Sequence, residues 1–171
     1  MVRQESELIQ DETGKVVGVK VSQGDQTATI SANRSVVLAT GGFGANVEMR
    51  EHYNTRWETL DESVKTTNSP AIVGDGIVMA MEIGADTTGL GVSQLMPSSS
   101  PIKGTMTDGI WADASEQIWI NGQGERFVDE YAERDVLAKA SLTLDNGIFY
   151  IIYAGSGMKE ADGLCKGASP E

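Results

Sequence analysis

Two glycine turns and one arginine are the residues of this sequence whose types and spacing favour ligand chemistry. The first turn, Thr40-Gly41-Gly42, directly follows the apolar run 35–39. Glycines allow positive φ and leave no side chain between the backbone and a neighbouring molecule. Because open α/β sheets bind ligands where a buried strand ends in such a turn, the motif predicts a binding edge. A plain core strand followed by a tight turn remains the alternative.

The second turn, Gly74-Asp75-Gly76, precedes apolar residues at helical spacing over 77–83. Asp75 is placed to cap this helix. The start of such a helix directs free backbone N–H groups at whatever lies in front of it, which favours an anion or an electron-rich ligand edge.

Arg134 stands where a further helix, over 134–142, is expected to begin. An arginine at such a point can hold a carboxylate through two parallel hydrogen bonds. For Arg134 taken alone, a surface ion pair with neighbouring acids is the simpler interpretation. The acids nearby are most simply read as a solvated charged face: Asp129, Glu130 and Glu133.

The elements that must position these residues follow from hydrophobic patterning. Alternation and turn residues predict a three-stranded β-meander over 7–31, which leads into a strand over 35–39. Val36, Val37 and Leu38 have no polar residue between them, so both faces of that strand should be buried. The elements expected further along are a helix over 47–53 capped by Asn46, a strand over 118–120 with a return strand over 126–128, the helix 134–142 and a buried strand over 149–153.

Composition excludes several classes of function. The net charge of −12 disfavours nucleic acid and anionic membranes as partners. No apolar run approaches the roughly 20 residues that span a bilayer, and no signal peptide is visible. His52 is the only histidine and Cys165 the only cysteine, which argues against a histidine-based triad, a disulfide and a catalytic thiol. No spacing of ligands supports a metal site.

Three stretches together closely resemble the flavoprotein subunits of the fumarate reductase and succinate dehydrogenase superfamily. They are residues 35–44 (SVVLATGGFG), 66–85 (TTNSPAIVGDGIVMAMEIGA) and 118–142 (IWINGQGERFVDEYAERDVLAKASL), in the family's order and spacing. The nearest branch resembles the soluble fumarate reductases of the flavocytochrome c type and urocanate-reductase-like enzymes. The resemblance covers most of residues 7–157.

The resemblance implies a mixed fold, α/β and α+β, in two parts. Residues 1–90 would form part of an FAD-binding domain, and residues 91–171 the beginning of a capping (clamp) domain. FAD would lie against Thr40, Gly41 and Gly42. The second turn, Gly74-Asp75-Gly76, would approach the cofactor near its flavin ring. The glycine-rich phosphate loop, G-x-G-x-x-G, is absent from the chain. We therefore expect a middle segment of a longer protein that binds FAD weakly or not at all by itself.

The resemblance also implies an activity for the complete protein, the reduction of the C=C bond of a small α,β-unsaturated carboxylate. The flavin would deliver a hydride, and Arg134, in the family's Glu-Arg-Asp motif, would deliver the proton. A cation there also stabilises the carbanion-like charge that develops. A haem or FMN module would supply electrons from outside this segment. The alternatives are an inactive isolated domain, or the same fold acting on a ketosteroid or an amino acid.

The sequence departs from the family at the substrate positions. Met96 replaces the histidine of a His-Pro pair, Thr107-Asp108 stands for a Thr-Glu pair, and Trp111 stands where a relay arginine is expected. Met96, Thr107 and Asp108 are thus the expected substrate contacts. Met96 and Trp111 favour a larger or less charged unsaturated acid than fumarate.

Overall fold

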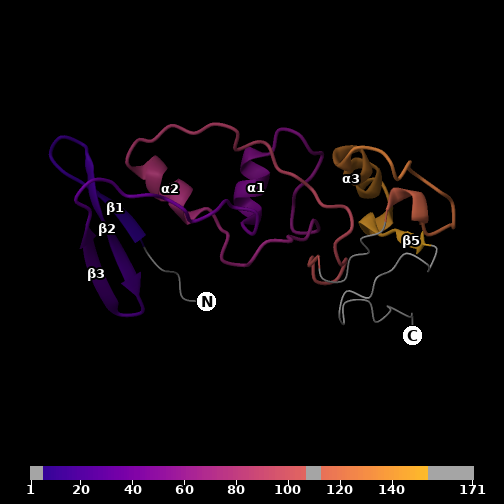
Figure 1. Cartoon of the computed structure of the whole chain (residues 1–171), viewed down its shortest axis with the longest axis horizontal. Coiled ribbons are helices and arrows are strands. Elements are labelled where there is room, and N and C mark those ends of the chain that lie inside the picture. Colours follow the sequence, from indigo (N-terminus) through magenta and orange to yellow (C-terminus); the bar gives the residue numbers. More distant parts are fainter. Residues whose placement is uncertain (1–5, 107–112, 154–171) are drawn as a thin grey trace.

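The chain forms an elongated, arched molecule with secondary structure spread along its length. The computed structural model describes residues 6–106 and 113–153. A three-stranded sheet lies at one end, helices α2 (Asp75–Glu82) and α1 (Val47–Tyr53) lie in the middle, and α3 (Arg134–Leu142) lies at the other end with β5 (Tyr150–Tyr153) (Figure 1). The mixture of small sheets and few helices agrees with the predicted fold class.

The predicted β-meander is confirmed. Strands β1 (Ser6–Gln10), β2 (Val16–Gln23) and β3 (Gln26–Ser31) pair antiparallel in the order of the sequence. Leu8 lies opposite Val19, and Val19 lies opposite Ile30. Leu8 is buried whereas Ile30 is 55% exposed, so the meander is covered only in part by the rest of the chain.

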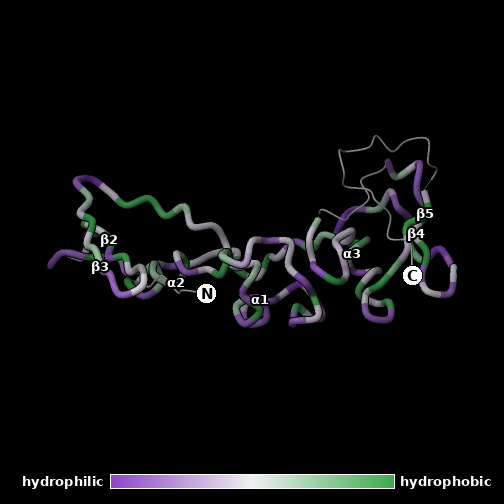
Figure 2. Tube along the Cα trace, turned by 90° about the horizontal axis from the view of Figure 1, so that it is seen from below, coloured by the Kyte–Doolittle hydropathy of each residue, from purple (hydrophilic) through white to green (hydrophobic). Residues whose placement is uncertain are grey.

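The predicted buried strand over 35–39 does not form. Residues 35–39 are assigned to no strand, and Val37 is 83% exposed. A strand buried on both faces requires strand neighbours at its edges and helices above and below. None of the strands among the described residues pairs with this segment. Hydrophobic stretches are accordingly scattered along the tube in Figure 2 and do not gather at one centre.

Helices α1 and α2 begin where the polar and glycine signals place them. The Asn46 side chain accepts a hydrogen bond from Met49 N at 3.1 Å and donates one to Val73 O at 2.9 Å. It therefore caps α1, as predicted, and also ties α1 to the chain that enters α2. Asp75 is not a cap but the first residue of α2. The capping position belongs to Gly74, at φ 87°, which forms no side-chain cap bond.

The second half of the chain forms a two-stranded sheet beside α3. Strand β4 (Gln117–Ile120) follows a short 3-10 helix, η1 (Ala114–Glu116), and pairs antiparallel with β5. A second 3-10 helix, η2 (Asp145–Gly147), precedes β5. The return strand predicted at 126–128 is reduced to a single bridge between Ile120 and Arg126. Tyr150 and Ile152 are 58% and 54% exposed, so the predicted burial of the last strand is wrong.

Glu130 is buried, which corrects the interpretation of residues 129–133 as a wholly solvated face. Its side chain is 2% exposed and accepts hydrogen bonds from Trp119 N at 2.7 Å and Arg126 Nη2 at 2.6 Å. The Trp119 ring stacks on Phe149 with centroids 4.6 Å apart. Glu130 therefore satisfies a backbone donor of β4 that the pairing with β5 leaves free.

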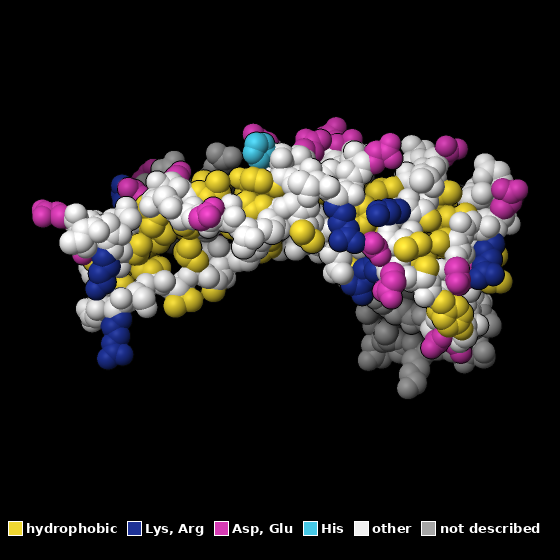
Figure 3. Space-filling model, turned by 90° about the horizontal axis from the view of Figure 1, so that it is seen from above, with side chains coloured by type: hydrophobic (Ala, Val, Ile, Leu, Met, Phe, Trp, Pro, Cys, Tyr) yellow, Lys and Arg dark blue, Asp and Glu magenta, His cyan; other side chains and the backbone are white. Residues whose placement is uncertain are grey.

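The main hydrophobic cluster joins the two halves of the chain. It consists of Trp57, Leu60 and Ala138, with Val64, Leu95 and Leu142 packed against them. The accessible surface of 12,372 Å² compares with about 8,100 Å² for a compact monomer of this mass. Much of the apolar surface therefore lies open to solvent, as the hydrophobic areas of Figure 3 show. No helix within residues 6–106 and 113–153 is long and apolar enough to cross a membrane.

Candidate functional site

The structure brings the two glycine turns together. A Cβ added at Gly76 would overlap the Thr40 side chain. A Cβ added at Gly41, where φ is +83°, would lie 3.2 Å from Ile72 Cδ1. The turn 40–42 therefore packs against the chain that enters and begins α2, although more than 30 residues separate the two segments.

Gly74 needs to be a glycine for two independent reasons. Its φ of +87° is one that other residues rarely adopt, and an added Cβ would lie 2.7 Å from Met49 Sδ and 2.8 Å from Phe43 Cβ. The turn is thus held between α1 and the residues that follow Gly42. The Asp75 carboxylate accepts a hydrogen bond from Gly76 N at 3.0 Å, so it engages one backbone donor of the first turn of α2.

The outer side of the glycine turn 40–42 suits a flat ligand. Thr40, Gly41 and Gly42 are exposed, and an added Cβ at Gly42 would have no atom within 4 Å. Bare backbone at this point lets an aromatic ring system approach without meeting a side chain. The residues present therefore fit a bound flavin along 40–42, next to the start of α2.

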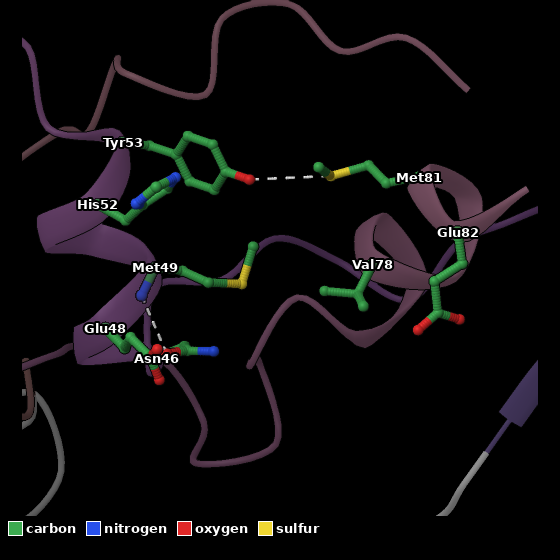
Figure 4. Close-up of a pocket in the computed structure, with 8 residues that line it drawn as sticks. All are labelled: Asn46, Glu48, Met49, His52, Tyr53, Val78, Met81 and Glu82. Atoms are coloured by element: carbon green, nitrogen blue, oxygen red, sulfur yellow. Dashed lines mark hydrogen bonds between the residues drawn. The ribbon is translucent and has the colours of Figure 1, made fainter. Parts of the chain in front are cut away.

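A cleft of about 630 Å³ lies between α1 and α2. Figure 4 shows Met49 and Tyr53 of α1 pointing toward Val78 and Met81 of α2. The Tyr53 hydroxyl lies 3.8 Å from Met81 Sδ, and the His52 ring meets the Tyr53 ring edge-on. Sequence reasoning missed this cleft, although apolar residues at i, i+4 in α1 and at i, i+3 in α2 are the signal that would have found it.

Arg134 begins α3, as predicted, but does not lie near the glycine turns. Its side chain is exposed and forms no hydrogen bond or ion pair with the residues that the structure describes. Helix α3 is separated from α2 along the long axis by α1 (Figure 1). The catalytic role of Arg134 stays a prediction.

The expected substrate positions are seen only in part. Met96 is half-buried and follows Leu95, which packs on the cluster around Trp57. Thr107 and Asp108 lie outside the described residues, as do Trp111 and Cys165. Among the described residues, no group of three or more histidine, cysteine, aspartate or glutamate side chains could hold a metal ion.

Residues 54–66, called here the bridging loop, are the part of the site that the sequence did not reveal. Trp57 is buried, and its Nε1 donates to Ser93 O at 2.7 Å. Arg50 of α1 is also buried and donates to Val64 O at 2.9 Å and Asp61 O at 3.3 Å. Burial lowers the pKa of Arg50. The bridging loop thus connects α1 to the segment that leads to Met96.

A signal for the bridging loop was present in its sequence. Trp57, Leu60 and Val64 are the large apolar residues of a stretch that otherwise consists of polar and charged residues. Isolated large apolar residues in such a stretch mark a point of attachment to a core. Trp57 and Leu60 belong to the main hydrophobic cluster, and Val64 packs against it.

Most of the chain matches a single known protein family. Residues 4–150 match the family described as FAD binding domain. An NADH:acrylate oxidoreductase from Vibrio harveyi is 46% identical over 142 residues, which are 82% of this chain and 14% of that protein. A urocanate reductase from Eggerthella lenta is 37% identical over 91% of this chain and 26% of its own length. The chain therefore spans only 14% and 26% of the length of these two relatives.

Solved structures with the same fold include enzymes of two kinds. The open conformation of a flavocytochrome c3 fumarate reductase superposes with a TM-score of 0.67 at 30% identity, over 85% of this chain and 26% of that one. A 3-ketosteroid Δ1-dehydrogenase from Sterolibacterium denitrificans gives a TM-score of 0.61 at 30% identity, over 79% of this chain and 24% of that one. The predicted resemblance to the fumarate reductase superfamily is confirmed.

Proposed function

The chain belongs to the FAD binding domain family. We propose that it is the segment of an FAD-dependent oxidoreductase in which the FAD-binding domain joins the capping domain. The observation that carries this proposal is the packing of Thr40 and Gly41 against the chain around Gly76, with bare backbone left exposed at Gly42. Thr40, Gly41 and Gly42 would hold FAD in this proposal, together with Gly74, Asp75 and Gly76 at the start of α2. Residues up to about 90 belong to the cofactor domain and later ones to the cap.

The reaction is the reduction of the C=C bond of an α,β-unsaturated carboxylate. When bound and reduced, FAD would supply the hydride for one carbon of the double bond. Arg134 donates a guanidinium proton to the neighbouring carbon and takes a proton back from solvent. The π bond is lost and two C–H bonds form, so atoms and electrons balance. The guanidinium of Arg134, which is exposed and has no ion-pair partner within residues 6–106 and 113–153, supports this role, because a free cation can stabilise the charge that develops beside the carboxylate.

We further propose a substrate with one carboxylate. Met96 replaces a histidine at an expected substrate contact, which removes a donor for a second carboxylate. Two of the relatives are named for acrylate and urocanate, each of which carries one carboxylate, whereas fumarate carries two. Thr107 and Asp108 complete the substrate contacts in this proposal. The electrons come from a haem or FMN module or protein, in keeping with the flavocytochrome among the similar structures.

Steady-state kinetics of the complete, FAD-loaded protein test this proposal. With reduced viologen as electron source, kcat/KM for acrylate or urocanate should exceed that for fumarate, and Arg134→Ala should lower kcat at least a hundredfold at unchanged flavin content. If no enoate is reduced, and Arg134→Ala leaves every activity intact, the proposal is wrong.

The ketosteroid dehydrogenase among the similar structures supports a second candidate, oxidation of a 3-ketosteroid with transfer of electrons to a dye. Turnover of a 3-ketosteroid in the absence of enoate reduction would favour it. For the chain alone, we expect weak binding of FAD or none. A flavin absorbance spectrum with near-stoichiometric FAD would overturn that expectation.

A further inference from the structure

The bridging loop contacts α3 through charge as well as through apolar packing. Arg56 Nη2 lies 2.8 Å from Asp135 Oδ2, and the two residues are 79 positions apart. Arg56 is the immediate neighbour of Trp57, whose ring packs in one cluster with Ala138 of α3. Figure 3 shows Lys and Arg side chains beside acidic ones toward the α3 end of the molecule.

These contacts define one face of α3. Asp135, Ala138 and Leu142 follow helical spacing and all contact the bridging loop or its cluster. Lys139 adds a cation 5.9 Å from the centroid of the Trp57 ring. Arg134 precedes Asp135 by one residue, so it is turned by about 100° around the helix axis. The face that carries Asp135 is fixed, and Arg134 is left at its edge, exposed and unpaired among the described residues.

The ion pair acts at the first turn of α3, where few other restraints exist. The capping residue Glu133 forms no side-chain hydrogen bond, and the buried residues of the helix, Ala138 and Ser141, lie further along. The hydrogen bond from Arg56 lowers the pKa of Asp135. Since both side chains are about 40% exposed, the pair contributes little to global stability. An effect of this pair on activity would instead be geometric, because Asp135 stands in the first turn of α3, next to Arg134.

We propose that Arg56 is a positioning residue that acts through Asp135 to hold Arg134 in its productive orientation. This inference rests on the proposed function of Arg134. Arg56 belongs to the cofactor side of the chain and α3 to the cap side, so the pair aligns the proton donor with the part of the molecule that holds the flavin. Displacements of about 1 Å at a reacting group can cost about a hundredfold in rate, which leaves room for an exposed ion pair to matter.

The test uses the complete, FAD-loaded protein. Arg56→Ala and Asp135→Asn should each lower kcat for enoate reduction about tenfold, with KM changed less than threefold, and Arg56→Lys should restore part of the loss. The double variant should be no slower than either single one, because both remove the same contact. The rate of flavin reduction by the donor and the flavin content should stay unchanged. Lys20→Ala, which removes an exposed ion pair with Glu7 in the meander, is the matched control and should have no effect.

The decisive measurement is Arg56→Ala in an Arg134→Lys background. If Arg56 acts through Arg134, the second substitution should cost less than twofold there. Retention of full kcat by Arg56→Ala and Asp135→Asn, or multiplication of their effects in the double variant, would overturn the inference while Arg134 keeps its role. Full activity of Arg134→Lys and Arg134→Ala would instead overturn the proposed function.

Discussion

The carboxylate of Glu130 lies 2.7 Å from the backbone nitrogen of Trp119 and 2.6 Å from Arg126 Nη2. The carboxylate therefore accepts hydrogen bonds both from the backbone of β4 and from the Arg126 guanidinium, and the side chain is only 2% exposed. Glu130→Gln keeps the shape but removes the charge, so we expect it to lower the free energy of unfolding of the complete protein by about 2 kcal/mol.

Urea unfolding measures this loss. Glu12→Gln, at an exposed acid for which the described residues offer no hydrogen bond or ion pair, is the control and should stay within about 0.5 kcal/mol of the parent. Equal stability of the two variants would show that the charge of Glu130 contributes nothing.

The pH dependence of stability follows from the same carboxylate. Burial by itself raises the pKa of Glu130, but the hydrogen bonds from Arg126 and from Trp119 N outweigh it and leave the pKa below the ordinary value of 4.5. A carboxyl whose pKa is lowered on folding stabilises the protein above its unfolded-state pKa. The contribution of Glu130 should therefore be complete above pH 4.5 and decline as the pH falls through the folded-state pKa.

Unfolding of the parent and of Glu130→Gln over a series of pH values checks the sign. The difference in stability between them should be constant near neutrality and shrink in acid. A difference that widens as the solution is acidified contradicts the assignment.

Gly76→Ala should impair cofactor binding even though alanine favours helices. An alanine in α2 gains about 1 kcal/mol of helix propensity over glycine. Its Cβ, however, would overlap the Thr40 side chain and push the turn 40–42 out of place. Flavin absorbance per protein should fall at least several-fold in the complete protein. Gly122→Ala is the control, because a Cβ there meets no atom within 4 Å. Equal flavin content in the two variants would contradict the contact as a cofactor determinant.

Trp57→Phe should loosen the attachment of residues 91–97 and α3 without emptying the hydrophobic cluster. The substitution keeps an aromatic ring but removes the Nε1 donor, so Ser93 O loses its 2.7 Å partner. The expected cost is about 1 kcal/mol. Hydrogen exchange should quicken at residues 91–97 and in α3, and stay unchanged in the meander. Tyr131→Phe, at a ring that is 68% exposed, should leave both regions unchanged.

Local signals in the sequence were enough to predict the elements that depend on neighbours in the chain. The β-meander needed only alternation and turn residues, and Asn46 caps α1 by a contact three residues away. Arg134–Leu142 forms the predicted helix because its spacing of apolar residues is visible in nine residues.

Predictions failed where the outcome depends on partners far away in sequence. Residues 35–39 have the composition of a buried strand but find no strand to pair with among the described residues. The burial of Glu130 depends on a backbone donor, Trp119 N, which no pattern of side chains in the sequence indicates. The ion pair between Arg56 and Asp135 joins residues 79 positions apart, and no local pattern indicates it.

The hydrogen bond from Trp57 to Ser93 bears on the design of chimeras between relatives. Under the proposed division near residue 90, an exchange of caps with a crossover there would separate Trp57 and Arg56 from Ser93, Ala138 and Asp135, the groups that they contact. Recombinant enzymes that carry residues 54–66 together with the grafted cap keep the matching surface intact. A graft meant to transfer substrate preference should therefore include the bridging loop, although this loop precedes Gly74-Asp75-Gly76 in the sequence.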